Sequence, residues 1–215
     1  MVKKLIGIIS YLPDNQAIRS QRFLMLVNLL KDCFKFNLPI MIIAQNWAPQ
    51  ELDALHDKCI IKTYPKLGIV GARNELRKQF IESEFDYLIM LDDDCILKLN
   101  QTGITEYLAE IDAHPSGAGE FRNTLLKLYA ISKDLLQQVD FDENISAETG
   151  VGFEDTIFVN KVRKKFKDKV YTFNCRGNNI NEVSLYTKDP LSTWYTDQDL
   201  KSMLVYTHKV IDNMK

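Results

Sequence analysis

The sequence of 215 residues lacks the features that mark several large classes of protein. No stretch comes close to the roughly 18 consecutive apolar residues that a membrane-spanning helix needs. The apolar run Leu5–Ile9, which follows two lysines, is too short for the hydrophobic region of a signal peptide, and Pro13 and Asp14 come soon after it. We therefore expect a soluble, cytoplasmic protein without a transmembrane segment.

Paired cysteines and an excess of one charge are also missing. The four cysteines are far apart, with no Cys-x-x-Cys pair and no histidine at zinc-binding spacing, which indicates reduced thiols. The 27 basic and 29 acidic residues give a net charge of −2, which disfavours a general nucleic-acid surface but leaves local patches open. With 46% hydrophobic and 26% charged residues, the composition is that of a globular domain and excludes disorder or a fibrous structure.

What the first half does contain is an alternation of strand-like and helix-like segments. Continuous apolar runs predict strands buried on both faces, and helical spacing predicts the segments between them. The expected strands are Leu5–Ser10, Pro39–Ala44, Cys59–Lys62 and Tyr87–Leu91, and the expected helices are Gln16–Phe36, Glu51–Asp57 and Gly68–Ser83. This order is typical of an α/β fold with a mainly parallel central sheet flanked by helices.

The second half has a less regular pattern. We expect helices at Thr102–Ala113, Lys133–Val139 and Asp155–Lys167, strands at Leu125–Ile131 and Val170–Asn174, and loops at His114–Glu120 and Asp140–Gly152. An irregular polar segment, Arg176–Asp197, then precedes a final amphipathic helix. The basic stretch Lys161–Lys169 is interpreted as the solvated face of a helix, with a patch for anionic acceptors as the alternative.

The most informative motif is the acidic triplet Asp92-Asp93-Asp94, which directly follows an apolar strand. Alternation along a strand would point Asp92 and Asp94 one way and Asp93 the other. The carboxyl end of a parallel strand is where α/β sheets bind ligands, and a hard divalent cation relieves the repulsion among adjacent carboxylates. The triplet therefore favours a site for a metal and a diphosphate over an acidic loop that caps the next helix.

A second acidic pair follows two glycines in the segment Gly150-Val151-Gly152-Phe153-Glu154-Asp155. Carboxylates at the start of a helix are stabilised by the helix dipole and by free backbone amides, which is the simplest interpretation. The functional interpretation is that the glycines let a substrate approach while one carboxylate serves as a general base. The pair alone leaves both interpretations open.

Taken in order, six segments resemble the GT-A-fold glycosyltransferases that use nucleotide sugars, in particular the inverting ones. They are LIGIISYLPD, PIMIIAQNW, GIVGARNELRKQF, YLIMLDDDCIL, LLKLYAISKDLL and GVGFEDTIFVNKV, and they span most of residues 1–170. The resemblance implies a hexosyltransferase-like enzyme that transfers a sugar from a nucleotide sugar, a UDP-sugar by preference, to an acceptor hydroxyl with inversion. It implies one domain over residues 1–215, with a nucleotide-sugar-binding half (1–100) and an acceptor-binding half (101–215).

The resemblance also implies roles for the acidic residues. Asp92 would lie near the ribose and the metal, and Asp94 would ligate a Mn²⁺ or Mg²⁺ that bridges the two phosphates. Asp93 would support the loop or contact the sugar. Asp155 would be the general base on the acceptor hydroxyl, and Glu154 would bind the acceptor or the donor sugar.

For the nucleotide, the resemblance implies contacts from Tyr11, Arg73 and Asn46. Many relatives carry an acidic residue after the second strand, whereas this chain has Gln45-Asn46 there. Many relatives also use a C-terminal histidine as a third metal ligand. That ligand stays open here between His208, which lies in an expected helix, one of Asn178, Asn179 and Asn181, and water.

Several alternatives remain. A nucleotidyltransferase would usually place a glycine-rich basic loop after the first strand, and SYLPDN contains no glycine. A phosphohydrolase would usually carry a hydroxyl residue where Ile96 stands, and a non-catalytic nucleotide-sugar-binding protein would not need both acidic motifs. The acceptor stays open among a glycan, a lipid-linked sugar, a protein and a modified nucleic acid. The oligomeric state is also open. Trp194 and Tyr195 either stack on an acceptor or anchor a long loop.

Overall fold

The computed structural model describes residues 2–12, 14, 16–97, 100–120, 128–142, 154–173 and 183–185. The strands are β1 (Lys4–Tyr11), β2 (Ile40–Gln45), β3 (Ile60–Tyr64), β4 (Tyr87–Asp92), β5 (Cys95–Leu97), β6 (Ala118–Glu120), β7 (Tyr129–Ser132), β8 (Val170–Thr172) and β9 (Val183–Leu185). The α-helices are α1 (Gln16–Cys33), α2 (Pro49–Leu52), α3 (Gly68–Glu82), α4 (Gln101–Ala113), α5 (Lys133–Leu136) and α7 (Glu154–Lys165), and the short 3₁₀ helices are η1 (Phe34–Phe36), η2 (Asp53–Leu55) and η3 (Lys167–Lys169).

The central sheet has seven strands in the order β3-β2-β1-β4-β7-β6-β8. Strands β3, β2, β1 and β4 are parallel to one another, β7 runs antiparallel between β4 and β6, and β8 is parallel to β6. A separate antiparallel pair joins β5 to β9. The mainly parallel α/β sheet predicted from the sequence is confirmed.

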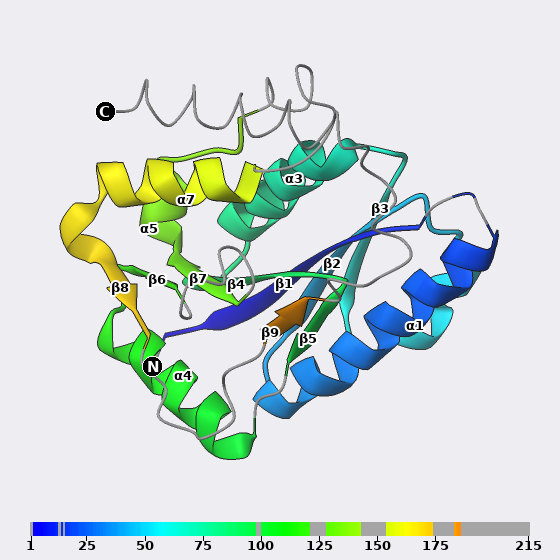
Figure 1. The fold of residues 1–215 in the computed structure, drawn as a ribbon, viewed down its shortest axis with the longest axis horizontal. Coiled ribbons are helices and arrows are strands. Elements are labelled where there is room, and N and C mark those ends of the chain that lie inside the picture. Colours follow the sequence, from blue (N-terminus) through cyan, green and yellow to red (C-terminus); the bar gives the residue numbers. More distant parts are fainter. Residues whose placement is uncertain are drawn as a thin grey trace.

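Helices cover both faces of this sheet (Figure 1), so the protein has three layers. Helices α1 and α4 pack on one face, and α3, α5 and α7 pack on the other. Alternate residues of β1 belong to different cores: Ile6 and Ile8 pack toward α1, whereas Leu5 and Ile9 pack toward α3. Because both faces are covered, the parallel strands carry continuous apolar runs rather than a polar-apolar alternation.

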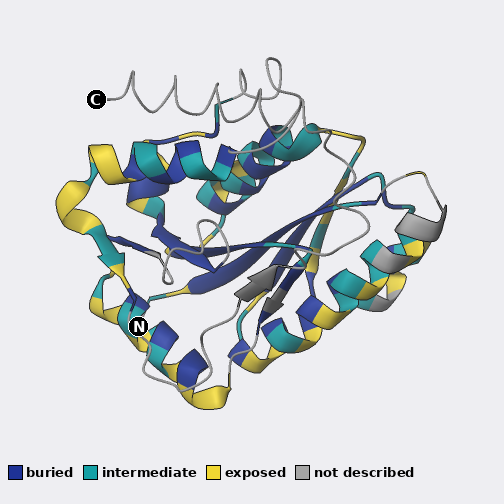
Figure 2. Ribbon diagram, viewed as in Figure 1, coloured by how far each residue is buried: buried dark blue, intermediate teal, exposed yellow. Residues whose placement is uncertain are grey.

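Burial follows the same layering (Figure 2). All six residues of β2 are buried, and β1 and β4 are buried up to their last residue. In α7, Phe158 and Val162 are buried whereas Arg163 and Lys164 are exposed, so the predicted solvated basic face of this helix is confirmed. Within the described residues, no helix is both long enough and apolar enough to cross a membrane.

Three short strands were not predicted. Strand β5 follows the acidic triplet, the expected loop His114–Glu120 contains β6, and the expected irregular segment Arg176–Asp197 contains β9. The residues of β6 are too small to produce a periodic pattern, and Gly119 is required because a Cβ there would lie 1.8 Å from Cζ of Phe173. Such a strand is defined by its partners, which a local sequence pattern does not contain.

Other boundaries changed less. The helix expected at Lys133–Val139 ends already at Leu136, and the strand expected at Leu125–Ile131 begins at Tyr129 among the described residues. The predictions for the final helix, the residues Trp194 and Tyr195 and the third metal ligand (His208, Asn178, Asn179 or Asn181) lie outside the described residues.

Candidate active site

The acidic triplet lies at the carboxyl end of β4, the central strand of the seven-stranded sheet, where the parallel part borders the antiparallel β7. Strand β4 ends at Asp92, and Asp93 and Asp94 form a turn that leads into β5. Asp93 faces the α1 layer, where its Oδ1 accepts a hydrogen bond from Arg22 at 2.8 Å, and Asp94 Oδ2 is 3.9 Å from the same nitrogen. The prediction that Asp94 points with Asp92 is therefore wrong, because the strand stops before strand alternation reaches Asp94.

Asp92 faces the opposite layer and meets a buried arginine. The Arg73 side chain comes from α3, and its Nη2 donates to Asp92 Oδ1 at 2.8 Å. The Nε of Arg73 donates to Glu154 Oε1, at the start of α7, at 3.2 Å. Burial opposes the charge of Arg73, but the charges of Asp92, Glu154 and Asp155 outweigh it and raise the pKa of the guanidinium. One arginine thus ties the acidic turn to the second acidic motif.

The second acidic pair divides into a buried and an accessible carboxylate. Glu154 is 3% exposed, and burial raises its pKa although the positive charge of Arg73 opposes the shift. Asp155 is partly exposed, and its Oδ1 accepts hydrogen bonds from the backbone N–H of Thr156 at 2.6 Å and from the Thr156 hydroxyl at 3.3 Å. These bonds hold the Asp155 carboxylate at the helix start, where the dipole favours negative charge.

Asp93 is the most buried carboxylate of the triplet. Its Oδ2 accepts a hydrogen bond from the Ser10 hydroxyl at 2.7 Å, and Trp47 Nε1 in turn donates to the Ser10 oxygen at 3.2 Å. Burial raises the pKa of Asp93 to about 6, against the opposing charge of Arg22, and the neighbouring Asp94 adds to the rise. This network fixes the turn to the end of β1 and leaves the triplet with an excess of negative charge.

The residues predicted to contact the nucleotide lie at the adjacent strand ends. Tyr11 ends β1, and Lys66 Nζ lies 5.6 Å from the centre of its ring. Asn46 follows β2 with a positive φ of 59°, and its Nδ2 donates to Leu12 O at 2.8 Å and Asp14 Oδ1 at 2.9 Å. The Asn46 amide therefore holds two loops together.

A cleft of about 500 Å³ opens beside these residues, at the carboxyl ends of β2 and β3. It is lined by Arg19, Asn46, Trp47, Ala48, Thr63, Tyr64 and Pro65. The carboxyl edge of the sheet thus carries both this cleft and the acidic turn, and this edge is the usual position of a ligand site in α/β proteins.

The donor set suits a hard divalent cation. Asp94 is partly exposed, and the triplet offers only oxygen ligands. Among the described residues, no group of three His, Cys, Asp or Glu side chains is arranged to hold a metal. Mg²⁺ sites often use one or two carboxylates and complete the shell with water and substrate phosphates. The residues present fit that pattern.

The structure therefore brings Arg73, Asp92, Glu154 and Asp155 into one cluster and places Asp93 and Asp94 beside it. Ser10 and Arg22, which hold the acidic turn, were not predicted as site residues. Nor was the structural role of Gln45, whose Oε1 accepts a hydrogen bond from Leu67 N at 2.9 Å before α3. Nothing local marks these residues, since each partner is distant in the sequence.

No protein-family model matches the chain, and no curated protein matches it in sequence. Solved structures do match its fold. TarS from S. aureus superimposes with a TM-score of 0.57 at 15% identity over 81% of this chain and 58% of that one. The same protein in complex with UDP-GlcNAc gives 0.52 at 16% identity over 94% and 65%.

Two further solved proteins share the fold. The mannosyltransferase PcManGT from Pyrobaculum calidifontis, in complex with GDP-Man and Mn²⁺, gives a TM-score of 0.55 at 13% identity over 80% of this chain and 54% of that one. CMP:2-keto-3-deoxy-manno-octonic acid synthetase in complex with CTP gives 0.51 at 10% identity over 80% and 89%. The chain spans little more than half the length of the TarS and PcManGT chains.

These likenesses define the class of fold. The chain has the GT-A-like α/β architecture of the nucleotide-sugar glycosyltransferases, as the resemblance in the sequence implied. The CTP-bound synthetase has a similar architecture, so the fold alone does not choose between sugar transfer and other nucleotide chemistry. The choice depends on the residues of the site.

Proposed function

We propose that the protein is a divalent-metal-dependent glycosyltransferase that transfers a sugar from a nucleotide sugar, preferably a UDP-sugar, to an acceptor hydroxyl with inversion. The observation that carries the proposal is the contact of Arg73 with both Asp92 and Glu154. It joins the acidic turn after β4 to the start of α7, where Asp155 lies. Two acidic motifs that are separate in the sequence therefore belong to one site.

In this proposal Asp94 ligates the cation, Asp92 lies near the ribose and the metal, and Tyr11 and the cleft beside Asn46 take the nucleotide. A bound Mn²⁺ or Mg²⁺ would neutralise the negative charge that develops on the leaving diphosphate. Arg73 orients Asp92, since its Nη2 donates a hydrogen bond to the carboxylate at 2.8 Å. Ser10 and Arg22 hold Asp93, which supports the turn rather than the sugar.

Asp155 serves as the general base. An acceptor hydroxyl attacks the anomeric carbon as the bond to the diphosphate breaks, and it must lose its proton to a group within hydrogen-bond reach. Asp155 is accessible, whereas Glu154 is buried against Arg73. We therefore assign the proton transfer to Asp155 and propose that Glu154 positions the start of α7. An inverting displacement of a diphosphate needs one carboxylate as base at the acceptor, because a bound cation would assist the leaving group in place of a general acid.

The experiment is a turnover panel. UDP- and GDP-sugars are incubated with the protein with and without Mn²⁺, and release of the nucleoside diphosphate is measured with water or added glycans as the acceptor. Mn²⁺-dependent release that is lost in Asp94→Ala and Asp155→Asn would support the proposal. Pyrophosphate release from nucleoside triphosphates and sugar phosphates would instead indicate a nucleotidyltransferase, and binding of the nucleotide sugar without turnover would indicate a non-catalytic protein.

A further inference from the structure

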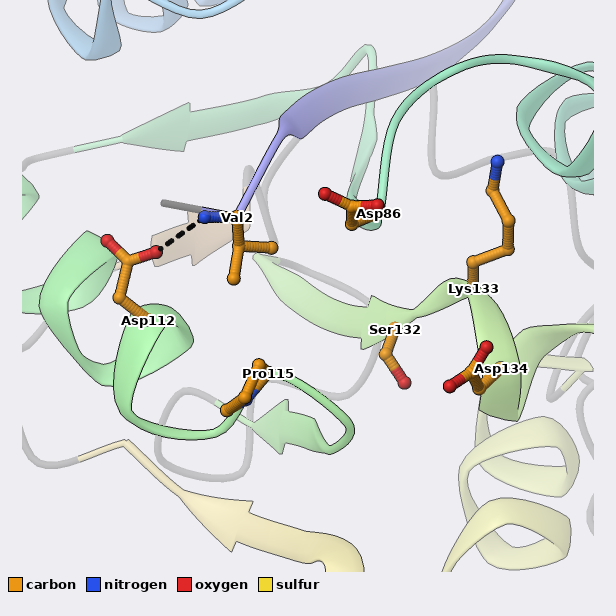
Figure 3. Close-up of a pocket in the computed structure, with 7 residues that line it drawn as sticks. All are labelled: Val2, Asp86, Asp112, Pro115, Ser132, Lys133 and Asp134. Atoms are coloured by element: carbon orange, nitrogen blue, oxygen red, sulfur yellow. Dashed lines mark hydrogen bonds between the residues drawn. The ribbon is translucent and has the colours of Figure 1, made fainter.

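A second cavity lies at the opposite, amino-terminal edge of the parallel strands, away from the acidic turn. Its volume is about 720 Å³. Figure 3 shows that its walls come from the start of β1, the C-terminal end of α4 and the junction of β7 with α5. It is lined by Val2, Asp86, Asp112, Pro115, Ser132, Lys133 and Asp134. Nothing in the proposed transfer reaction uses these residues.

The floor of this rear pocket holds a polar group without a partner. Ser132 is 2% exposed, and its buried hydroxyl has no hydrogen-bond partner among the described residues. Ser132 is the N-cap residue of α5, where a serine hydroxyl usually accepts a hydrogen bond from the helix backbone, yet this hydroxyl makes no such bond. Figure 3 shows the side chain directed into the space between Pro115 and Asp134. A buried hydroxyl left unpaired is costly, so a bound group would stabilise it.

The rim of the rear pocket is acidic. Asp112 comes from the C-terminal turn of α4, where the helix dipole adds negative potential, and Asp134 comes from α5 on the other side (Figure 3). Burial would raise the pKa of Asp112, but the hydrogen bond from Lys4 Nζ at 2.6 Å, the positive charge of Lys4 and the hydrogen bond from Val2 N together lower it, so Asp112 is ionised at neutral pH. Asp86 adds a third carboxylate.

Lys4 pairs with Asp112 through Oδ1, whereas the lysine in the lining is directed away from Asp134. Lys133 Nζ donates to the backbone oxygen of Ser83 at 2.6 Å and lies 5.4 Å from the centre of the Phe80 ring. Figure 3 shows its side chain leading away from Ser132 and Asp134. Between the acidic ends lie the apolar side chains of Val2 and Pro115. The pocket therefore has carboxylates at opposite sides, an apolar middle and an unpaired hydroxyl.

We propose that the rear pocket binds a linear aliphatic diammonium compound, with one ammonium group on Asp134 and the Ser132 hydroxyl and the other on Asp112. An alkylammonium group donates three hydrogen bonds, which matches a carboxylate and a hydroxyl oxygen side by side. Its alkyl chain contacts Val2 and Pro115. Because the site lies at the amino-terminal edge of the sheet, it is independent of the proposed transfer reaction.

The test is an NMR titration of the ¹⁵N-labelled full chain with putrescine, compared with 1,4-butanediol as the uncharged isostere and with Mg²⁺. We expect saturable shifts of the amides of Ser132, Lys133 and Asp134 with putrescine only. Each of Ser132→Ala and Asp134→Asn should weaken the binding about tenfold, the effect of losing one hydrogen bond to a charged group. Asp53→Asn removes an exposed carboxylate that does not line the pocket and should leave the affinity unchanged.

Three results would overturn this assignment. Butanediol or Mg²⁺ could produce the same shifts at the same concentrations, which would mean that the ammonium groups are not recognised. Putrescine could bind Ser132→Ala and Asp134→Asn as tightly as the original protein. Finally, no saturation at millimolar putrescine would show that the cavity holds water only. Thermal unfolding of each variant checks that the fold is retained.

Discussion

The carboxylates at the two edges of the parallel strands are paired with different basic residues. At the carboxyl edge, Asp92 and Asp93 are each paired with an arginine, and Arg73 is almost completely buried. At the amino-terminal edge the pairs use lysine: buried Lys4 contacts the exposed Asp112 at 2.6 Å, and Lys3 pairs with Glu84 at 2.6 Å with both side chains largely exposed. Arginine presents a rigid fork of donors, whereas lysine is a flexible point charge, so only the first arrangement fixes a carboxylate in a set direction. We infer that orientation is needed at the edge where chemistry takes place.

Removal of the buried Arg73 should have the largest effect on both stability and turnover. Arg73→Ala leaves Asp92 and Glu154 facing one another without a cation, and breaking a buried pair costs about 3–5 kcal/mol. Chemical denaturation should show this loss of unfolding free energy, and metal-dependent turnover should disappear. Arg73→Lys keeps the charge but not the fork, so it should recover part of the stability and little of the turnover. Unchanged stability in Arg73→Ala would contradict the cluster.

Loss of the general base should affect the reaction but not the fold. Asp155→Asn keeps the shape of a partly exposed side chain, so we expect turnover of the nucleotide sugar to fall about 10²–10⁴-fold, the usual contribution of a positioned base. Donor binding and thermal stability should stay near those of the original protein. The matched control is Asp134→Asn at the other edge, which should leave turnover unchanged. Full turnover in Asp155→Asn would remove the assignment of the base.

The buried carboxyl of Asp93 should make stability depend on pH. Its folded-state pKa of about 6 lies above the usual value of 3.8, so the folded protein binds the proton more tightly than the unfolded chain. Its contribution is therefore most favourable at low pH and is lost as the pH rises through about 6, a change on the order of 3 kcal/mol. Denaturation between pH 4 and 7 should show a flatter profile for Asp93→Asn than for the original protein. Parallel profiles would show that Asp93 does not titrate in this range.

Loss of the exposed Lys3–Glu84 ion pair should have the smallest effect on stability. Lys3 and Glu84 are both largely solvent-accessible, and such pairs contribute little because water and salt screen them. Lys3→Ala should leave the melting temperature unchanged in low and high salt. A clear loss of stability that added salt removes would mean that the amino-terminal edge also depends on a fixed ion pair, and the contrast between the edges would not hold.

Much of the fold could be predicted from the sequence because the parallel strands carry continuous apolar runs. The strands β1, β2 and β4 lie within a residue or two of their expected ranges. Strands β5, β6 and β9 could not be predicted, because three residues carry too weak a pattern. Their places are set by their partners: β5 and β9 pair with each other, and β6 lies against Phe173. The antiparallel direction of β7 was likewise not visible in its residues.

The site was predictable to the extent that its residues form motifs. The acidic turn and the Glu154-Asp155 pair were recognised, but their connection through Arg73 was not, since nothing local shows which carboxylates an arginine will meet. The direction of Asp94 was wrong because the prediction extended the strand into a turn. Ser10 and Arg22 were missed because the chain reaches Asp93 only after several further elements.

The most direct test of the central claim is a calorimetric titration of UDP into the protein with and without Mn²⁺, repeated with Asp94→Ala and Asp155→Asn. Our account predicts saturable binding that requires Mn²⁺, is lost in Asp94→Ala and is retained in Asp155→Asn. Equal binding with and without Mn²⁺, unaffected by Asp94→Ala, would contradict a metal-dependent diphosphate site at the carboxyl end of β4.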